Sequence, residues 1–300
     1  MSKITKALEK AARERLQHLQ EQPTTKAEAV EVPIVSVTPS RVGKRVGEIG
    51  LSAAETVQID PHIVAATDPK SPISEQYRIL RTNLQSLKFR PGPKVIAVTS
   101  AVHGEGKSVT SINLALTLAR QENLKVVLVD ADLRKGTIHK WLGMADRTKG
   151  LSTVLARGGE FDGDLVTLSE PNLAVLPAGG YPDNPAELLE SSAMKRLLAT
   201  LKTQYDVVVI DAPPVLPVSD PSILSSHADA VLLVVRAGKT QRKTVAQSYA
   251  LLDQVKANVV GCVLTHVEYY LPGYYRYYHY YQYRSKHDEA KKQVEAKATK

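Results

Sequence analysis

The chain has 300 residues, of which 43% are hydrophobic and 23% charged, a composition typical of an ordinary globular protein. Its formal net charge of +8 admits phosphate groups, nucleic acid or an anionic membrane surface as partners but selects none of them. The single cysteine, Cys262, excludes an intrachain disulfide, and its apolar surroundings in the sequence predict a buried thiol rather than a nucleophile. No apolar stretch approaches the roughly 20 residues that span a bilayer, and the N-terminus lacks the apolar core of a signal peptide. We therefore expect a cytoplasmic protein.

The first 67 residues divide into a helix and a linker. Residues 1–20 predict an amphipathic helix, whose apolar stripe is Ile4, Leu8, Ala12, Leu16 and Leu19. Such a helix could lie on an anionic membrane or a partner, or remain solvated without either. Residues 21–67 contain prolines at 23, 33 and 39, clustered Ser and Thr, and no sustained period, which predicts a disordered linker.

A folded domain is expected from residue 68 to residue 268, and it opens with a helix that starts at Ser71-Pro72 and ends before Pro91. The apolar stripe of this helix is Ile73, Tyr77, Leu80, Leu84 and Leu87. Glu75, Arg78 and Arg81 lie three residues apart on an adjacent face. Intrahelical ion pairs on a solvated surface, each worth about 0.2–0.5 kcal/mol, would explain this spacing.

The rest of the domain alternates short apolar runs with helical patterns. The runs are residues 95–98, 126–129, 173–176, 207–210, 230–235 and 259–264, and helices are expected after residue 107, over 186–201 and over 244–255. Continuous apolar strands imply burial on both faces, and hence a mostly parallel sheet covered by helices with right-handed crossovers. The sequence predicts a doubly wound α/β domain.

A phosphate-binding loop follows the first strand. It reads Ala101-Val102-His103-Gly104-Glu105-Gly106-Lys107-Ser108, and Val109 continues it into a helix. Backbone N–H groups at such a helix N-terminus point at the phosphates of a nucleotide, Lys107 reaches their charge, and Ser108 offers a hydroxyl to Mg²⁺. We expect residues 101–109 to bind ATP.

Acidic residues follow two of the predicted strands. Asp130 and Asp132 come after residues 126–129, and Asp211 comes after residues 207–210. Carboxylates at the ends of parallel strands beside a triphosphate can hold Mg²⁺ and accept a proton from an incoming hydroxyl. With Lys107 and Ser108 they predict an ATPase or kinase site.

Over residues 70–283 the sequence resembles the bacterial tyrosine kinases, P-loop autokinases attached to polysaccharide synthesis, and in particular their free-standing members of exopolysaccharide loci. The resemblance is carried by the loop 101–108, by Asp130-Ala131-Asp132-Leu133-Arg134, by Asp211-Ala212-Pro213-Pro214, by the face of Glu75, Arg78 and Arg81, and by a tyrosine cluster. It implies that Lys107 binds phosphates, that Ser108, Asp132 and Asp211 organise Mg²⁺, and that Asp130 accepts the tyrosine proton. It also implies that Glu75, Arg78 and Arg81 join subunits into a ring.

The tyrosine cluster occupies residues 269–283, followed by a charged tail over 284–300. It comprises Tyr269, Tyr270, Tyr274, Tyr275, Tyr277, Tyr278, Tyr280, Tyr281 and Tyr283, of the 13 tyrosines in the chain. A flexible segment could thread these hydroxyls into a neighbour's active site, and each phosphate would add about −1.5 to −2 charges. The alternative is an aromatic tail that packs on a partner or stacks on single-stranded nucleic acid. No RNA-binding fold accompanies the cluster, and we do not expect nucleic acid as a partner.

Three residues depart from the family pattern without touching the chemical centre. Ala101 replaces the first loop glycine, His103 stands where proline is frequent, and Thr265 takes the place of an asparagine that often contacts adenine. The alternative function is a switch ATPase of the cell-division-positioning or plasmid-partitioning kind, without kinase activity. Such proteins carry an extra lysine where this chain has Val102, and they lack a tyrosine run.

The sequence therefore predicts an ATP- and Mg²⁺-dependent protein tyrosine autokinase that phosphorylates the tails of neighbouring subunits. The resemblance implies control of exopolysaccharide polymerisation, chain length and export. It also implies an activating membrane protein that determines chain length and recruits the kinase to the inner face of the membrane, and a tyrosine phosphatase that resets the tail.

Overall fold

The computed structural model describes residues 59–87, 92, 94–144, 149–160, 164–168 and 173–267. In this part of the chain a seven-stranded sheet has the order β3-β4-β2-β5-β1-β6-β7. The strands are β1 (Lys94–Ser100), β2 (Val126–Asp130), β3 (Val166–Leu168), β4 (Leu173–Leu176), β5 (Val207–Asp211), β6 (Ala230–Arg236) and β7 (Val259–Thr265). Only β3, which pairs antiparallel with β4, departs from the parallel arrangement of the described sheet. The doubly wound, mostly parallel fold is confirmed.

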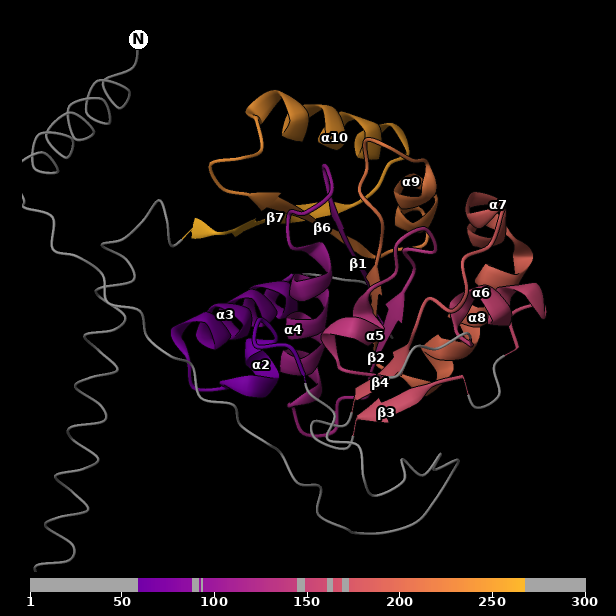
Figure 1. Ribbon diagram of the computed structural model, residues 1–300, viewed down its shortest axis with the longest axis horizontal. Helices are drawn as coiled ribbons and strands as arrows, with labels where there is room; N and C mark the ends of the chain where they lie inside the picture. Colours follow the sequence, from indigo (N-terminus) through magenta and orange to yellow (C-terminus); the bar gives the residue numbers. More distant parts are fainter. Residues whose placement is uncertain are drawn as a thin grey trace, which may run out of the picture. The chain divides into compact units, whose positions relative to one another are not determined.

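Helices cover both faces of this sheet (Figure 1). They are α2 (Val64–Thr67), α3 (Pro72–Ser86), α4 (Lys107–Ala119), α5 (Ile138–Trp141), α6 (Leu151–Ala156), α7 (Pro185–Glu190), α8 (Ser192–Gln204), α9 (Asp220–Ser225) and α10 (Arg242–Gln254). None of the helices in the described ranges is long and apolar enough to cross a membrane.

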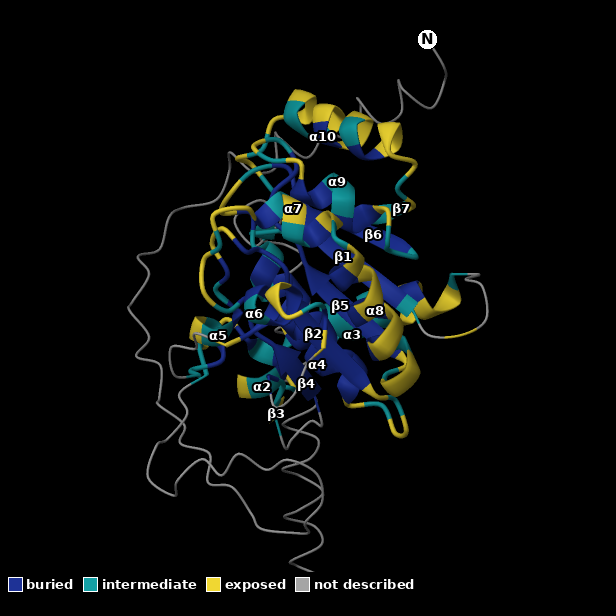
Figure 2. Ribbon diagram, turned by 90° about the vertical axis from the view of Figure 1, so that its right-hand side faces the viewer, coloured by how far each residue is buried: buried dark blue, intermediate teal, exposed yellow. Residues whose placement is uncertain are grey.

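Successive residues of a strand contribute to the cores on opposite faces of the sheet, because side chains alternate sides along a strand. In β1, Ile96 and Val98 join the core beneath α2–α5, whereas Val95 and Ala97 face the clusters under α6–α10. Both faces of the central strands are therefore buried, which explains their continuous apolar sequence. Figure 2 shows this as a buried centre flanked by helices with exposed outer sides.

The edge strand β7 corrects the prediction that residues 259–264 are buried on both faces. None of its residues is fully buried, Cys262 is exposed, and 60% of Leu264 is accessible. The expectation of a buried Cys262 thiol is wrong. A continuous apolar run looks the same in a central strand and in an edge strand, because periodicity does not record how many neighbours a strand has.

The helix α3 confirms the pattern that starts at Ser71-Pro72. The Ser71 hydroxyl accepts a hydrogen bond from the Ser74 N–H at 3.1 Å, which caps the helix, and proline occupies its first turn. Leu84 is buried, but Ile73 is 41% exposed, so the predicted apolar stripe begins one turn too early.

The predicted end of the linker at residue 67 is also wrong, because the structure already describes the chain from residue 59 as part of the fold. Ile63 is fully buried, and residues 64–67 form α2. Asn113 of α4 fixes this segment: its carboxamide accepts from the Ala65 N–H at 2.8 Å and donates to the His62 carbonyl at 3.0 Å. Ala65 and Asn113 are 48 residues apart in the sequence, so no local pattern could predict this contact.

Candidate active site

The phosphate-binding loop connects the carboxyl end of β1 to the first turn of α4, as predicted. Gly104 and Gly106 have φ values of +77° and +90°, a backbone conformation that side-chain-bearing residues rarely adopt. Gly106 is the N-cap of α4, and no side chain caps this helix. Its first N–H groups are thus left for an anionic ligand, in the direction that the helix dipole favours.

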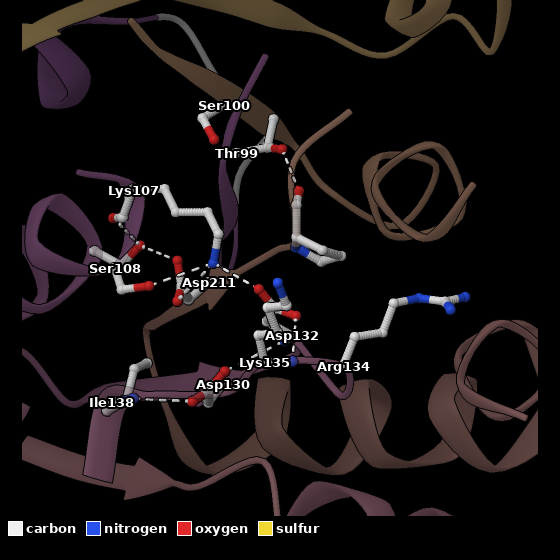
Figure 3. Close-up of polar contacts among 12 residues, drawn as sticks. Thr99, Ser100, Lys107, Ser108, Asp130, Asp132, Arg134, Lys135, Ile138 and Asp211 are labelled. Atoms are coloured by element: carbon white, nitrogen blue, oxygen red, sulfur yellow. Dashed lines mark hydrogen bonds and ion pairs between the residues drawn. The ribbon is translucent and has the colours of Figure 1, made fainter. Parts of the chain in front are cut away.

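Lys107 lies between two carboxylates that come from different strands (Figure 3). Its Nζ is 2.8 Å from Asp132 Oδ2 and 3.6 Å from Asp211 Oδ2, and it donates to Ser108 Oγ at 3.3 Å. Burial disfavours the ammonium, but the charges of Asp211 and Asp132 outweigh burial and raise the pKa of Lys107 to about 12. The predicted cation and two of the predicted acids therefore form one buried cluster.

Asp211 lies beside Asp130 because β5 pairs with β2 in that register. Asp211 Oδ1 accepts a hydrogen bond from Ser111 Oγ at 2.9 Å, whereas its Oδ2 is buried and has no hydrogen-bond partner in the described structure. Burial raises the pKa of Asp211, although Lys107, Ser108 and Ser111 all act in the opposite direction.

Asp130 is completely buried one strand away. Its carboxylate accepts the Ile138 N–H at 3.1 Å and the Asp132 N–H at 3.3 Å. Burial, followed by the charge of Asp211, raises the pKa of Asp130 to about 8. This carboxyl group therefore titrates near neutral pH, where a side chain serves best as an acid or a base.

The loop after β2 is held by two further contacts. Asp132 Oδ1 accepts the Lys135 N–H at 2.9 Å. Arg134 binds Asp220, the first residue of α9, through two parallel hydrogen bonds of 2.8 and 3.0 Å. Because Asp220 is fully buried, this bidentate pair anchors the loop that carries Asp132.

The oxygens of this cluster fit Mg²⁺. They are the Ser108 hydroxyl and the carboxylates of Asp132 and Asp211. Asp211 Oδ2 accepts no hydrogen bond and has only the 3.6 Å ion pair with Lys107, so a hard cation could use it as a ligand. Among the described residues no group of three or more His, Cys, Asp or Glu side chains could form a metal site by itself. Mg²⁺ typically keeps water and phosphate ligands beside one or two carboxylates.

The remaining loop residues differ in exposure. Ala101 and Glu105 are buried, Val102 and Val109 are half-buried, and His103 and Gly104 are exposed. Partial burial, and then the charge of Lys135, lower the pKa of His103. The Thr265 hydroxyl donates to the Glu105 carbonyl at 2.7 Å, so its partner is the loop backbone.

The predicted oligomer contacts lie on α3, away from this cluster. Arg78 forms an ion pair with Glu75 at 2.5 Å and donates to the Pro69 carbonyl at 2.6 Å. Arg81 donates to the Thr117 carbonyl at 3.2 Å, near the far end of α4 from Lys107. These contacts are within the chain. The nine predicted acceptor tyrosines lie outside the described residues.

Sequence reasoning missed Ser111, Asp220 and the side chain of Glu105. Ser111 follows Lys107 by four residues, so helix periodicity alone places both side chains on one face. Asp220 precedes a proline at a helix start, which explains its place in the chain but gives no hint of its partner. Two partners of the Glu105 carboxylate, Arg236 and Thr240, lie more than 130 residues away, and no spacing rule identifies them.

Comparisons with known proteins agree with this geometry. A family profile described as an AAA domain matches residues 93–261. The chain is 40% identical over 220 residues to tyrosine-protein kinase YwqD of Bacillus subtilis, covering 71% of this chain and 91% of that protein. It is 34% identical to tyrosine-protein kinase wzc of Salmonella typhimurium over 74% of this chain, but spans only 31% of that longer relative.

A solved structure of the kinase domain of the Escherichia coli tyrosine kinase ETK superposes with a TM-score of 0.64 at 33% identity. It covers 67% of this chain and 78% of that domain. The chimerical protein CapA2B2 gives the same TM-score and identity, over 69% of this chain and 91% of that one. With its phosphate loop, its strand-end aspartates and these relatives, the chain belongs to the bacterial tyrosine kinase family.

Proposed function

We propose that the protein is an ATP- and Mg²⁺-dependent protein tyrosine kinase that transfers the γ-phosphoryl group to tyrosines of residues 269–283 on a neighbouring subunit. The observation that carries this proposal is the buried cluster in which the Lys107 ammonium lies between Asp132 and Asp211 at the N-terminus of α4. Phosphoryl transfer depends mainly on positioning and charge neutralisation, and this cluster supplies both signs of charge.

The cluster suggests how the site changes when substrate arrives. Lys107 would exchange its carboxylate partners for phosphate oxygens, which would free Asp132 and Asp211 to hold Mg²⁺ together with Ser108. Bound Mg²⁺ would neutralise phosphate charge. The backbone N–H groups of residues 104–109 would orient the phosphates, because the glycines and the uncapped helix end leave them accessible.

Asp130 is the residue that we assign to proton transfer. It lies beside Asp211 at the ends of paired strands. Because its pKa is raised to about 8, most molecules of the nucleotide-free protein carry a proton on Asp130 at neutral pH, and Asp130 would act as a base only after it releases this proton. It would accept the hydroxyl proton of an incoming tyrosine as the oxygen attacks the γ-phosphorus.

A mixing experiment tests transfer between subunits. A chain truncated after Glu268 keeps the site but has no tyrosine cluster, and full-length Lys107→Met keeps the cluster without the catalytic cation. Incubated together with ATP and Mg²⁺, the Lys107→Met chain should gain phosphotyrosine, whereas neither variant should do so alone. No phosphate on the mixed sample, with wild-type protein active beside it, would refute transfer between subunits.

We also propose that Glu75, Arg78 and Arg81 contribute to a homo-oligomeric ring, which supplies the neighbouring tail. Arg78→Ala combined with Arg81→Ala should lower the mass in sedimentation. Lys195→Ala with Arg196→Ala is a matched control, because it removes two exposed positive charges from α8. Arg81 also contacts α4, so circular dichroism must first show that both double variants are folded. Equal masses for the two variants would exclude this face as an interface.

Regulation of exopolysaccharide synthesis completes the proposal and rests on the family resemblance. A membrane protein that determines chain length would recruit and activate the kinase, and a phosphatase would reset the tail. Several phosphates would make the tail strongly acidic, and repulsion between such tails would favour dissociation of the ring.

A further inference from the structure

Glu105 is an acid inside a loop that should bind anions. It lies between the two left-handed glycines, yet its side chain is almost completely buried, with 1% of the residue exposed. A carboxylate beside a phosphate site is electrostatically unfavourable unless it is compensated by donors. The described structure supplies three such donors, from two places in the chain.

The first donor belongs to the same loop. The Val102 N–H donates to Glu105 Oε2 at 2.8 Å, which closes a turn across three residues. This bond fixes the direction of one peptide group at the start of the loop. Between Val102 and Glu105, the carbonyl of the exposed Gly104 accepts a longer hydrogen bond of 3.5 Å from the Arg236 guanidinium.

The other donors come from the end of β6 and from the segment that leads from β6 to α10. Glu105 Oε1 accepts the Thr240 hydroxyl and, at 3.4 Å, the N–H of Arg236, the last residue of β6. The backbone of Glu105 is held from a third side, because the Thr265 hydroxyl at the end of β7 donates to its carbonyl at 2.7 Å. Glu105 thus joins the phosphate loop to two strands that lie on one side of β1 in the sheet.

The geometry points to Glu105 as a positioning residue that holds the phosphate loop in its nucleotide-binding conformation before the nucleotide arrives. This inference rests on the proposed binding of ATP. A loop that is already ordered loses less conformational freedom on binding, and so binds more tightly. Thr240 acts through Glu105 and needs no contact with the nucleotide.

Substitutions at residues 105 and 240 test this role. Glu105→Ala removes the shared acceptor and should weaken ADP binding, measured by calorimetry, about tenfold or more. Glu105→Gln keeps the shape and an acceptor oxygen for the Val102 N–H, and the Thr240 hydroxyl can turn to accept from the new amide. The long bond from the Arg236 N–H is lost, so this variant should recover part of the affinity. A Glu105→Ala variant that melts at a lower temperature but binds ADP normally would overturn the inference.

A double-mutant cycle tests the path through Thr240. Thr240→Ala should weaken ADP binding when Glu105 is present and should have no further effect in the Glu105→Ala background, because its partner is then missing. Additive losses would overturn the claim that Thr240 acts through Glu105.

Hydrogen exchange of the nucleotide-free protein separates this inference from the proposed function. Glu105→Ala should speed amide exchange in residues 101–108, while exchange in β2 stays unchanged. Unchanged exchange in the loop would overturn the inference whether or not the protein binds nucleotide. Wild-type protein without affinity for ATP or ADP would overturn the proposed function, and loop exchange would still decide on the role of Glu105.

Discussion

The ion pair between Arg134 and Asp220 offers a quantitative test of how the site is built. Arg134→Ala removes both hydrogen bonds of 2.8 and 3.0 Å and leaves the Asp220 carboxylate unpaired. The Asp220 side chain is fully buried, whereas that of Arg134 is 39% exposed. Breaking a fully buried pair costs about 3–5 kcal/mol and a surface pair about 0–1 kcal/mol, so we expect a loss of about 2 kcal/mol of stability.

Thermal and denaturant unfolding without nucleotide would measure this loss. For a domain of this size 2 kcal/mol corresponds to a fall of about 4–8 °C in the melting temperature. Arg134→Ala combined with Asp220→Asn should be less destabilised than Arg134→Ala alone, because no buried carboxylate is then left unpaired. Arg196→Ala, an exposed arginine on α8, is the control and should change little. The reasoning would be refuted if Arg134→Ala lost less than about 0.5 kcal/mol of unfolding free energy, or if the double variant were less stable than Arg134→Ala alone.

Three further predictions concern Asp130, Gly136 and Cys262. Between about pH 4 and pH 8 Asp130 carries a proton in the folded, nucleotide-free protein, whereas the unfolded chain has released it. The free energy of unfolding should therefore fall as the pH rises through this window, by at most about 1.4 kcal/mol per pH unit for one proton. Asp130→Asn should flatten this dependence in denaturant titrations without Mg²⁺, and an equally steep slope would contradict the raised pKa. Gly136→Ala would bring a Cβ to 2.4 Å from the Ala178 Cβ and 2.9 Å from Asp130 Oδ2, so it should reduce both the melting temperature and phosphoryl transfer. If Gly136→Ala kept the melting temperature and the phosphoryl transfer of the wild type, the loop would have to move enough to accommodate the added Cβ. Because Cys262 is exposed on β7, a thiol reagent should modify the native protein without denaturant, and labelling only after unfolding would contradict its exposure.

The sequence predicted which side chains lie together where each part of the candidate site is defined by a few adjacent residues. The loop 101–108 follows a strand and opens a helix, and Asp130 and Asp211 each end an apolar run. In a parallel sheet such strand ends meet at one edge, so local patterns were enough to bring Lys107, Asp132 and Asp211 together.

Features that depend on distant partners could not be predicted in this way. Asn113 orders residues 62–65, and Glu105 binds the segment before α10, through contacts between residues far apart in sequence. The exposure of Cys262 follows from the edge position of β7, which the apolar run itself does not encode. Strand β3 has three residues, too few for a period to emerge.

The intact mass of the purified protein after incubation with ATP and Mg²⁺ tests the central claim most directly. The wild-type chain should gain mass in steps of one phosphate. Lys107→Met and a chain truncated after Glu268 should gain none when incubated separately. If the wild type gains no phosphate alone, the measurement should be repeated with the cytoplasmic segment of the proposed membrane partner. Hydrolysis of ATP with no phosphate on the protein, even then, would contradict the kinase and favour a switch ATPase.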